Sequence, residues 1–247
     1  MAHGGNMTCG VIFDLDGVLV DSYQAHYESW RRFAAEQEFA YSQQQFAATF
    51  GRTSREILAH HWPRKLSAQE IAAADDRKEE LYRQIIRENF PIMPGARELV
   101  RGLHAAGFRL AVGSSAPPAN VELSLDLLGL RELFGAAVTG RDVTHGKPDP
   151  QVFLLAAGRL ALPPNNCAVV EDAPAGIQAA LAGGMTAIAI TGTVAREQLS
   201  SAHLVVDRLE QLTPVKIERL IRDRLQIANC ASTSLSTLSR PKGKLQI

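Results

Sequence analysis

The sequence predicts an α/β fold, a doubly wound parallel sheet with an inserted small helical cap domain. Three observations predict it: short apolar runs recur along the chain, helical patterns lie between them, and one long interval is almost entirely helical. The runs are continuous rather than alternating, which suits strands buried on both faces of a parallel sheet. Strands that alternate with helices imply right-handed βαβ units and therefore a doubly wound arrangement.

The expected strands and helices follow from local patterns. Helical spacing over Ala96–Gly107 predicts a helix that ends at the glycine. A second helix is expected to start at Asp149–Pro150, with Asp149 as N-cap and Pro150 in the first turn. Six apolar runs are expected to be strands: Val11–Phe13, Arg109–Val112, Ala136–Val138, Ala168–Val170, Ala187–Ile190 and Leu204–Val206.

The chain between the first strand and Arg109 is longer than one crossover needs, and two apolar stripes at helical spacing run through it. We therefore expect an inserted helical domain, closed by Pro91 and Pro94. From Asn229 the chain is rich in Ser and Thr and shows no periodicity, which predicts a mobile tail. The expected parts are core at 8–21, helical cap at 22–92, core again at 93–228 and tail at 229–247.

Composition excludes several classes of protein. Apolar residues make up 46% of the chain and charged residues 21%, so it is not wholly disordered. The 26 basic residues balance the 26 acidic ones, so neither nucleic acid nor an anionic membrane is expected as the main partner. Cys9, Cys167 and Cys230 lie far apart and form no CxxC, which favours a reducing compartment over a disulfide framework.

Neither a membrane span nor a secretory signal is expected. The charge-free stretch Ala173–Ala195 is interrupted by proline, glycine and polar residues, so it is expected to form a loop, a helix and a strand. The start, MAHGGNMTCG, lacks a charged n-region and an apolar h-region. The expectation is a soluble cytoplasmic protein.

Two carboxylates follow the first expected strand, in Phe13–Asp14–Leu15–Asp16–Gly17. Like charges placed together in a sparsely solvated crevice are costly unless a cation joins them, and oxygen ligands in an open site suit Mg²⁺. Asp-Gly after a strand is also an ordinary turn, so this motif alone leaves both interpretations open.

Other expected strands also lead into polar residues: Ser114–Ser115, Lys147 before a helix start, and Glu171–Asp172. A serine-rich loop or an isolated lysine is common on protein surfaces, and each is weak evidence alone. Ligands in open α/β sheets bind outside the carboxyl ends of the strands. Several polar clusters delivered to that one edge therefore predict a functional site.

Taken together, these motifs resemble the haloacid dehalogenase (HAD) superfamily of aspartyl-phosphate phosphotransferases, and within it the β-phosphoglucomutase-like branch with a helical cap. The resemblance covers about Val11–Arg208. It rests on DLDGVLVDS, VGSSAPPANV, GKPDP and VVEDAPAGIQAALAGGM in the family's order and approximate spacing. It implies a HAD-like, Rossmannoid core and an enzyme that uses Mg²⁺.

The resemblance implies that Asp14 is the nucleophile that takes the phosphoryl group. Asp16 would be the general acid–base, and its backbone carbonyl would also bind Mg²⁺. Asp172 would be the third magnesium anchor, with Glu171 as a direct or water-mediated helper. Because a halide leaving group needs no proton, the carboxylate at Asp16 disfavours dehalogenation.

The resemblance also implies a phosphate-binding group, Ser114 with the amide of Ser115, and a charge-neutralising lysine, Lys147. Phosphoryl transfer needs in-line positioning and neutralisation of the equatorial oxygens, which a divalent cation, a lysine and loop donors supply. A carboxyl-phosphate intermediate divides one difficult step into two easier ones.

In the expected cap, His26 and Lys78 resemble residues that the mutase branch uses beside its active site. Either Arg52 or Arg55 matches the arginine that grips the distal phosphate, and the Ser-Arg-Glu match favours Arg55. Solvated surface positions are the competing interpretation of all these residues. Pro117–Pro118 departs from the polar residues of the mutase pattern, which weakens the case for a strict mutase.

The sequence therefore predicts a Mg²⁺-dependent phosphatase of a small phosphorylated metabolite, a sugar phosphate by preference, acting through a phospho-aspartate. The first alternative is β-phosphoglucomutase or a similar phosphomutase, which shares every core residue. A more remote alternative is a non-catalytic binding module that retains the fold. The expected partner is the metabolite alone, and the expected state is a monomer or weak homodimer.

Overall fold

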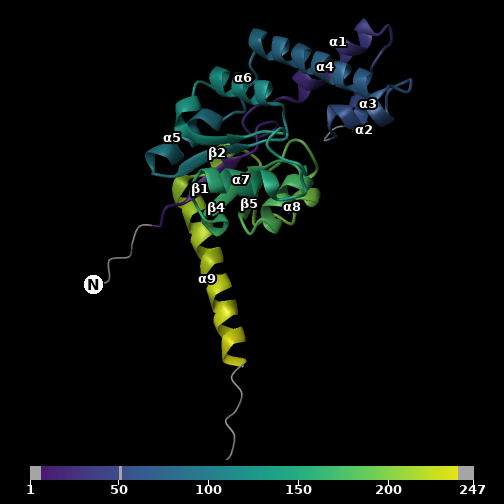
Figure 1. The fold of residues 1–247 in the computed structure, drawn as a ribbon. Coiled ribbons are helices and arrows are strands. Elements are labelled where there is room, and N and C mark those ends of the chain that lie inside the picture. The colour runs from purple at the N-terminus through teal and green to yellow at the C-terminus, as the bar shows by residue number, and fades with distance from the viewer. Residues whose placement is uncertain (1–6, 50–51, 239–247) are drawn as a thin grey trace, which may run out of the picture.

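A six-stranded parallel sheet forms the centre of the protein (Figure 1). The computed structural model describes residues 7–49 and 52–238, with the backbone alone from residue 228. The strand order is β3-β2-β1-β4-β5-β6, and all five pairings are parallel, which confirms the doubly wound fold. The strands are β1 (Gly10–Phe13), β2 (Arg109–Gly113), β3 (Phe134–Val138), β4 (Cys167–Glu171), β5 (Thr186–Ile190) and β6 (Leu204–Val206).

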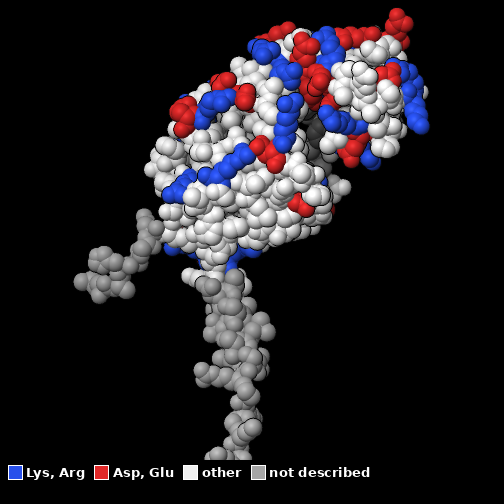
Figure 2. Space-filling model, viewed as in Figure 1, with Lys and Arg blue, Asp and Glu red and all other residues white. Residues whose placement is uncertain are grey.

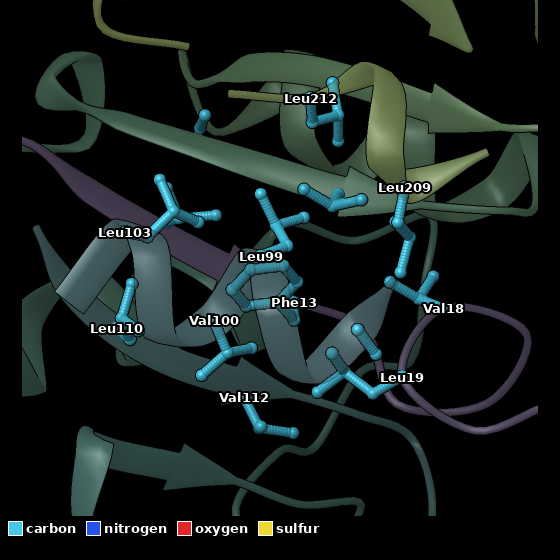
Figure 3. Packing of buried hydrophobic residues seen from close by; sticks show 14 of the residues in the cluster. Phe13, Val18, Leu19, Leu99, Val100, Leu103, Leu110, Val112, Leu209 and Leu212 are labelled. Carbon is cyan, nitrogen blue, oxygen red and sulfur yellow. The ribbon is translucent and has the colours of Figure 1, made fainter. Parts of the chain in front are cut away.

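Successive residues of the central strand β1 point to opposite faces of the sheet, as a strand requires. Phe13 packs on one face among side chains of α5, β2 and the segment 209–212, as Figure 3 shows. Ile12 packs on the other face, in a second apolar cluster with residues of α7 and α8. From residue 93 onward the helices are α5 (Ala96–Ala105), α6 (Pro118–Leu128), α7 (Gln151–Arg159), α8 (Pro174–Ala182) and α9 (Pro214–Leu238).

Short 3₁₀ helices complete the core: η1 (Arg131–Leu133), η2 (Pro164–Asn166), η3 (Arg196–Leu199) and η4 (Leu209–Gln211). The stretch from Ala173 folds into a loop, α8 and β5, as expected, and no helix among the described residues is long and apolar enough to cross a membrane. On the face drawn in Figure 2, basic and acidic side chains are interspersed over the described residues, in agreement with the zero net charge.

Among the described residues, five helices lie between β1 and β2, and the first four of them stand apart from the sheet (Figure 1). Two of them, α3 and α4, begin with capping boxes, in which Thr53 and Ser67 each bond a glutamate three residues on. Trp30, Phe33 and Leu81 belong to an apolar cluster formed by these helices and the loops between them. The elements are α1 (Tyr23–Glu36), α2 (Gln43–Thr49), α3 (Ser54–His60) and α4 (Ala68–Glu88).

Two expectations differ from the structure. Pro150, not Asp149, is the N-cap of α7, although the Asp149 carboxylate still accepts a hydrogen bond from the Gln151 amide at 2.9 Å. Irregular chain was expected from Asn229, but α9 continues to Leu238 and runs away from the body (Figure 1). Residues 239–247 lie outside the described residues, and the mobility of the tail stays a prediction.

Candidate active site

The carboxyl ends of β1 and β4 bring the predicted acidic residues together. Phe13 pairs with Val170 in the parallel register, so Asp14 and Glu171 leave neighbouring strands at the same level. The Asp14 amide continues the ladder with a hydrogen bond to the Val170 carbonyl at 2.9 Å. Carboxylate oxygens of Asp14, Glu171 and Asp172 all lie within 4.8 Å of one another, and all three residues are buried.

Lys147 reaches this acidic group from the loop before α7. Its Nζ donates to Asp14 Oδ1 at 2.6 Å and to Glu171 Oε1 at 2.6 Å. It also lies 4.8 Å from the ring centroid of the buried Phe153, within the range of a cation–π contact. Burial alone would lower the pKa of Lys147, but Asp14 and Glu171 raise it above its ordinary value, so the ammonium stays charged.

Both oxygens of the Glu171 carboxylate have protein donors. Oε1 accepts from Lys147, while Oε2 accepts from the amides of Asp172 and Ala173, each at 2.8 Å. Glycine is needed where these carboxylates pass close to the backbone. A side chain at Gly176 would overlap the Glu171 carboxylate, and one at Gly17, where φ is +75°, would overlap Asp172.

The acidic group lacks compensating charge. Burial is the largest cause that raises the pKa of Asp14, to about 7, and the opposing Lys147 does not cancel it. Burial, then Glu171 and Asp14, also raise the pKa of Asp172 well above its ordinary value. Three carboxylates and one ammonium leave an excess of negative charge among oxygen donors. A divalent cation fits that excess, and Mg²⁺ prefers such oxygens.

Asp16 is placed in a different environment from Asp14. Its Oδ1 accepts a hydrogen bond from the Tyr82 hydroxyl at 3.2 Å and lies 3.4 Å from His26 Nε2. Burial would raise the pKa of Asp16, but His26 and the hydroxyls of Ser22 and Tyr82 outweigh it and lower the pKa to about 2. Asp16 is therefore a carboxylate in this arrangement.

The structure brings His26 and Lys78 to the site but leaves Arg55 apart. His26 stacks on Tyr82, with ring centroids 4.1 Å apart, and its Nδ1 lies 3.0 Å from Lys78 Nζ. Lys78 is only 2% exposed, so it faces protein groups rather than open solvent. Arg55 is exposed and forms an ion pair with Asp75 at 2.9 Å. Arg52 is exposed as well.

The predicted phosphate-binding residues lie at the end of the adjacent strand. Val112 of β2 pairs with Phe13, so Ser114 follows β2 beside the loop that carries Asp14 and Asp16. Ser114 is buried, and its Oγ accepts from the Ala116 amide at 3.0 Å, whereas Ser115 is exposed. The two serines thus form a tight turn at the same edge of the sheet.

Three further polar residues in or beside the site escaped the sequence analysis. Tyr82 lies four residues after Lys78 on α4, and this helical spacing was the available signal. Thr193, in the loop after β5, donates a short hydrogen bond to Asp172 Oδ2. Asn120 on α6, at 1% exposure, donates a hydrogen bond to Glu79 on α4. Asn120 lies within the quoted VGSSAPPANV, but nothing in that motif marks its contact with α4, and the isolated Thr193 belongs to no motif.

A parallel sheet that presents buried carboxylates and a bridging lysine at its carboxyl edge, under a helical insertion, defines an enzyme core of the HAD type. The model of the haloacid dehalogenase-like hydrolase family matches residues 10–184, and the chain belongs to this family. Among curated relatives, hexitol phosphatase A from Escherichia coli is 36% identical over 213 residues, covering 85% of this chain and 96% of that protein.

β-Phosphoglucomutase from Bacillus subtilis is 30% identical over 210 residues, covering 82% of this chain and 91% of that protein. Among solved structures, β-phosphoglucomutase from Clostridium difficile aligns with a TM-score of 0.77 at 27% identity, covering 89% of this chain and 99% of that one. These findings confirm the predicted family and fold. They also support an enzyme that acts on phosphate esters.

Proposed function

We propose that this enzyme is a Mg²⁺-dependent phosphatase of small sugar phosphates that acts through a phospho-aspartate intermediate. The observation that carries the proposal is the buried group in which Lys147 bridges Asp14 and Glu171 beside Asp172. This group combines a carboxylate nucleophile, a fixed positive charge and a set of oxygen ligands, which are the parts that phosphoryl transfer requires.

In the first half-reaction an Asp14 carboxylate oxygen attacks phosphorus, and the bond from phosphorus to the sugar oxygen breaks. Lys147 holds the attacking carboxylate at 2.6 Å and neutralises charge on the transferring group. The turn at Ser114 and Ser115 supplies hydroxyl and amide donors to the phosphoryl oxygens. Glu171 acts mainly through Lys147, because both of its oxygens already accept hydrogen bonds.

Asp16 moves the protons. As a carboxylate it removes a proton from the water that attacks the phospho-aspartate, which releases phosphate and restores Asp14. For the first half-reaction it must be protonated so that the sugar oxygen leaves as a hydroxyl. A phosphate ester beside Asp16 adds negative charge, which raises the pKa of Asp16 and favours that protonated form.

The metal would be held by Asp14, Asp172 and the backbone carbonyl of Asp16, with Glu171 close behind. When bound, Mg²⁺ would neutralise charge on the phosphoryl oxygens and hold the phosphate in line with Asp14. The uncompensated negative charge of the buried carboxylates supports this assignment.

Sugar phosphates are the substrate class that the relatives favour, since the 36% identical relative is a hexitol phosphatase. The helices α1–α4 support the same class. We propose that residues 22–92 form a cap that closes over small metabolites and excludes water from the reaction. His26 and Lys78 would then act from the cap on Asp16, rather than touch the substrate's distal end.

A phosphomutase is the second candidate, because the C. difficile β-phosphoglucomutase structure aligns along 89% of this chain. A mutase would pass the phosphoryl group to a sugar hydroxyl instead of water. Incubation with β-glucose 1-phosphate and a bisphosphate primer separates the two activities. Glucose 6-phosphate without free phosphate would favour the mutase, and free phosphate alone the phosphatase.

The decisive experiment is Asp14→Asn. The variant keeps the shape of the side chain but removes the nucleophile, so Mg²⁺-dependent phosphate release from an aryl phosphate should fall on the order of 10³-fold or more. Asp126→Asn is the matched control, because Asp126 pairs with Arg131 on the exposed surface and should retain activity. Full activity in folded Asp14→Asn protein would end the phospho-aspartate mechanism.

A further inference from the structure

A chain of buried polar contacts runs from the core helix α6 through the cap and back to the catalytic loop. Asn120 Nδ2 on α6 donates to Glu79 Oε2 at 2.7 Å, and Glu79 Oε1 accepts from Lys78 Nζ at 2.9 Å. Lys78 Nζ lies 3.0 Å from His26 Nδ1, and His26 Nε2 lies 3.4 Å from Asp16 Oδ1. The links between Asn120 and Asp16 all belong to α1 and α4.

Arg83 sets the orientation of the Asn120 amide. An arginine only donates hydrogen bonds, so its contact at 2.8 Å must fall on Oδ1 of Asn120. The amide nitrogen then points at Glu79. Ser54 donates to the same glutamate at 2.8 Å. Burial would raise the pKa of Glu79, but the Lys78 ammonium and the hydrogen bond from Asn120 help to lower it to about 2.

Lys78 orients His26 in the same way. An ammonium only donates, so His26 Nδ1 must accept and Nε2 carries the hydrogen that faces Asp16. Stacking on Tyr82 fixes the plane of the imidazole ring, and the Tyr82 hydroxyl bonds the same Asp16 oxygen. The geometry around Asp16 therefore depends on where α4 lies.

The position of α4 relative to the core depends in turn on α6. Leu123 and Leu127 of α6 pack against the apolar cluster of Ala25, Tyr82 and Ile86. Apolar packing is non-directional, so it does not by itself select one register of α4 on α6. The hydrogen bonds of Asn120 are directional, and its 1% exposure means that breaking them leaves buried groups unpaired.

We propose that Asn120 is a positioning residue for catalysis, through which the core helix α6 seats the cap so that Lys78 and His26 are aligned on Asp16. This inference rests on the proposed function, because it assigns the purpose of the alignment to proton transfer by Asp16. A cap rotated away from α6 would lose the Asn120–Glu79 contact and the alignment of His26 together.

A double-mutant cycle tests the proposal with an aryl phosphate at saturating Mg²⁺. Asn120→Ala should lower kcat about tenfold while KM changes by less than about twofold, since the effect passes to the reacting group through neighbouring contacts. Lys78→Met should cause a similar loss, and the double variant should fall no more than about twofold below Lys78→Met alone. Arg83→Met, which leaves Asn120 in place but frees its amide to turn, should cause a smaller loss of kcat.

Leu127→Ala is the matched control, because it removes apolar packing between the same helices without touching a polar link. It should lower Tm and leave kcat within about twofold of the parent enzyme. The proposal is overturned if the double variant loses the product of the two single-variant decreases in kcat, or if Asn120→Ala keeps the parent kcat. It is also overturned if kcat falls as far in Leu127→Ala as in Asn120→Ala.

A second readout needs no activity. Lys78 is buried, so acetic anhydride can acetylate it only when the cap moves away from α6. The acetylation rate of Lys78, measured by mass spectrometry relative to the exposed Lys216, therefore reports how often the cap detaches from α6. Asn120→Ala should raise the relative rate at Lys78 about tenfold, and Leu127→Ala should raise it far less. An unchanged acetylation rate of Lys78 in Asn120→Ala would show that Asn120 does not hold the cap against α6. Activity that survives in Asp14→Asn overturns the proposed function instead. The acetylation result does not depend on activity, so it tests the role of Asn120 separately.

Discussion

At the scale of single residues, one carboxylate of the acidic group depends on a hydroxyl from a distant loop. Thr193 donates to Asp172 Oδ2, and Asp172 lies in the acidic group with Asp14 and Glu171. Groups that hydrogen-bond a metal ligand orient it and tune its affinity. Thr193→Val should therefore weaken Mg²⁺ binding about tenfold, as measured by calorimetric titration of the protein.

Thr191 provides the control for this prediction. It lies in the same loop, but its hydroxyl bonds the exposed Asp207 at 2.9 Å. Thr191→Val should leave Mg²⁺ affinity unchanged. Equal affinities in the two valine variants would show that the Thr193 hydroxyl does not orient Asp172.

Residues at strand ends were predictable, and residues that reach the site from elsewhere were not. Asp14 and Glu171 follow apolar runs, and a parallel sheet must bring such positions to one edge. Lys147 was identified because its motif lies before a helix start. Thr193 and Asn120 act through hydrogen bonds to distant segments, and the geometry of these bonds depends on packing that local sequence patterns do not encode. Arg55 is exposed and pairs with Asp75, and its contact with substrate stays a prediction.

At the scale of elements, the first turn of α8 fits against the site only because residue 176 is glycine. A Cβ there would overlap the Glu171 carboxylate, which holds Lys147. Gly176→Ala should therefore displace Glu171 and lower kcat about tenfold or more. Alanine favours the helix over glycine by roughly 0.5–1 kcal/mol, so the loss of activity should not come from loss of helix.

Gly158 in α7 is the matched position, because a Cβ there would meet nothing within 4 Å. Gly158→Ala should raise the free energy of unfolding by roughly 0.5–1 kcal/mol and leave kcat unchanged. Steady-state kinetics and urea unfolding on both variants check the pair. Full activity in Gly176→Ala would mean that Glu171 tolerates displacement.

Strand positions were predicted well because each buried strand is a short apolar run between polar turns, whereas helix ends were predicted less well. The N-cap of α7 is Pro150, one residue later than predicted, and Asp149 accepts a hydrogen bond from the Gln151 amide from a position outside the helix. A mobile tail is predicted from Asn229 because the chain there is rich in serine and threonine and has no periodicity, but α9 continues to Leu238. No glycine or proline occurs from Val215 to Leu238, so nothing in the chain forces the helix to stop.

At the scale of the whole molecule, the length of the interval after β1 predicted a helical insertion, and α1 to α4 occupy that interval. That interval has an apolar cluster of its own, separate from the clusters on the two faces of the sheet. The identity of the substrate was not predictable, because the side chains of the inserted segment follow no pattern in the sequence that identifies a ligand.

The buried acidic group also makes the stability of the whole protein depend on pH and metal. The pKa of Asp14 is raised from 3.8 to about 7, and that of Asp172 is raised as well. Between these values the folded state binds more protons than the unfolded state, so the free energy of unfolding falls as pH rises. Asp16 and Glu79, with pKa values lowered to about 2, titrate below this range.

Metal-free protein should therefore melt about 5 °C lower at pH 7.5 than at pH 5, and Mg²⁺ should recover most of that loss at pH 7.5 but little at pH 5. Calorimetric scans with and without Mg²⁺ measure both effects. His203, whose pKa burial lowers, acts in the opposite direction, so Asp14→Asn is needed to isolate the carboxylate. That variant should flatten the metal-free pH dependence, because it removes the proton that Asp14 binds on folding. A metal-free Tm that rises from pH 5 to 7.5, or a slope unchanged in Asp14→Asn, would show that the acidic group is already compensated by Lys147.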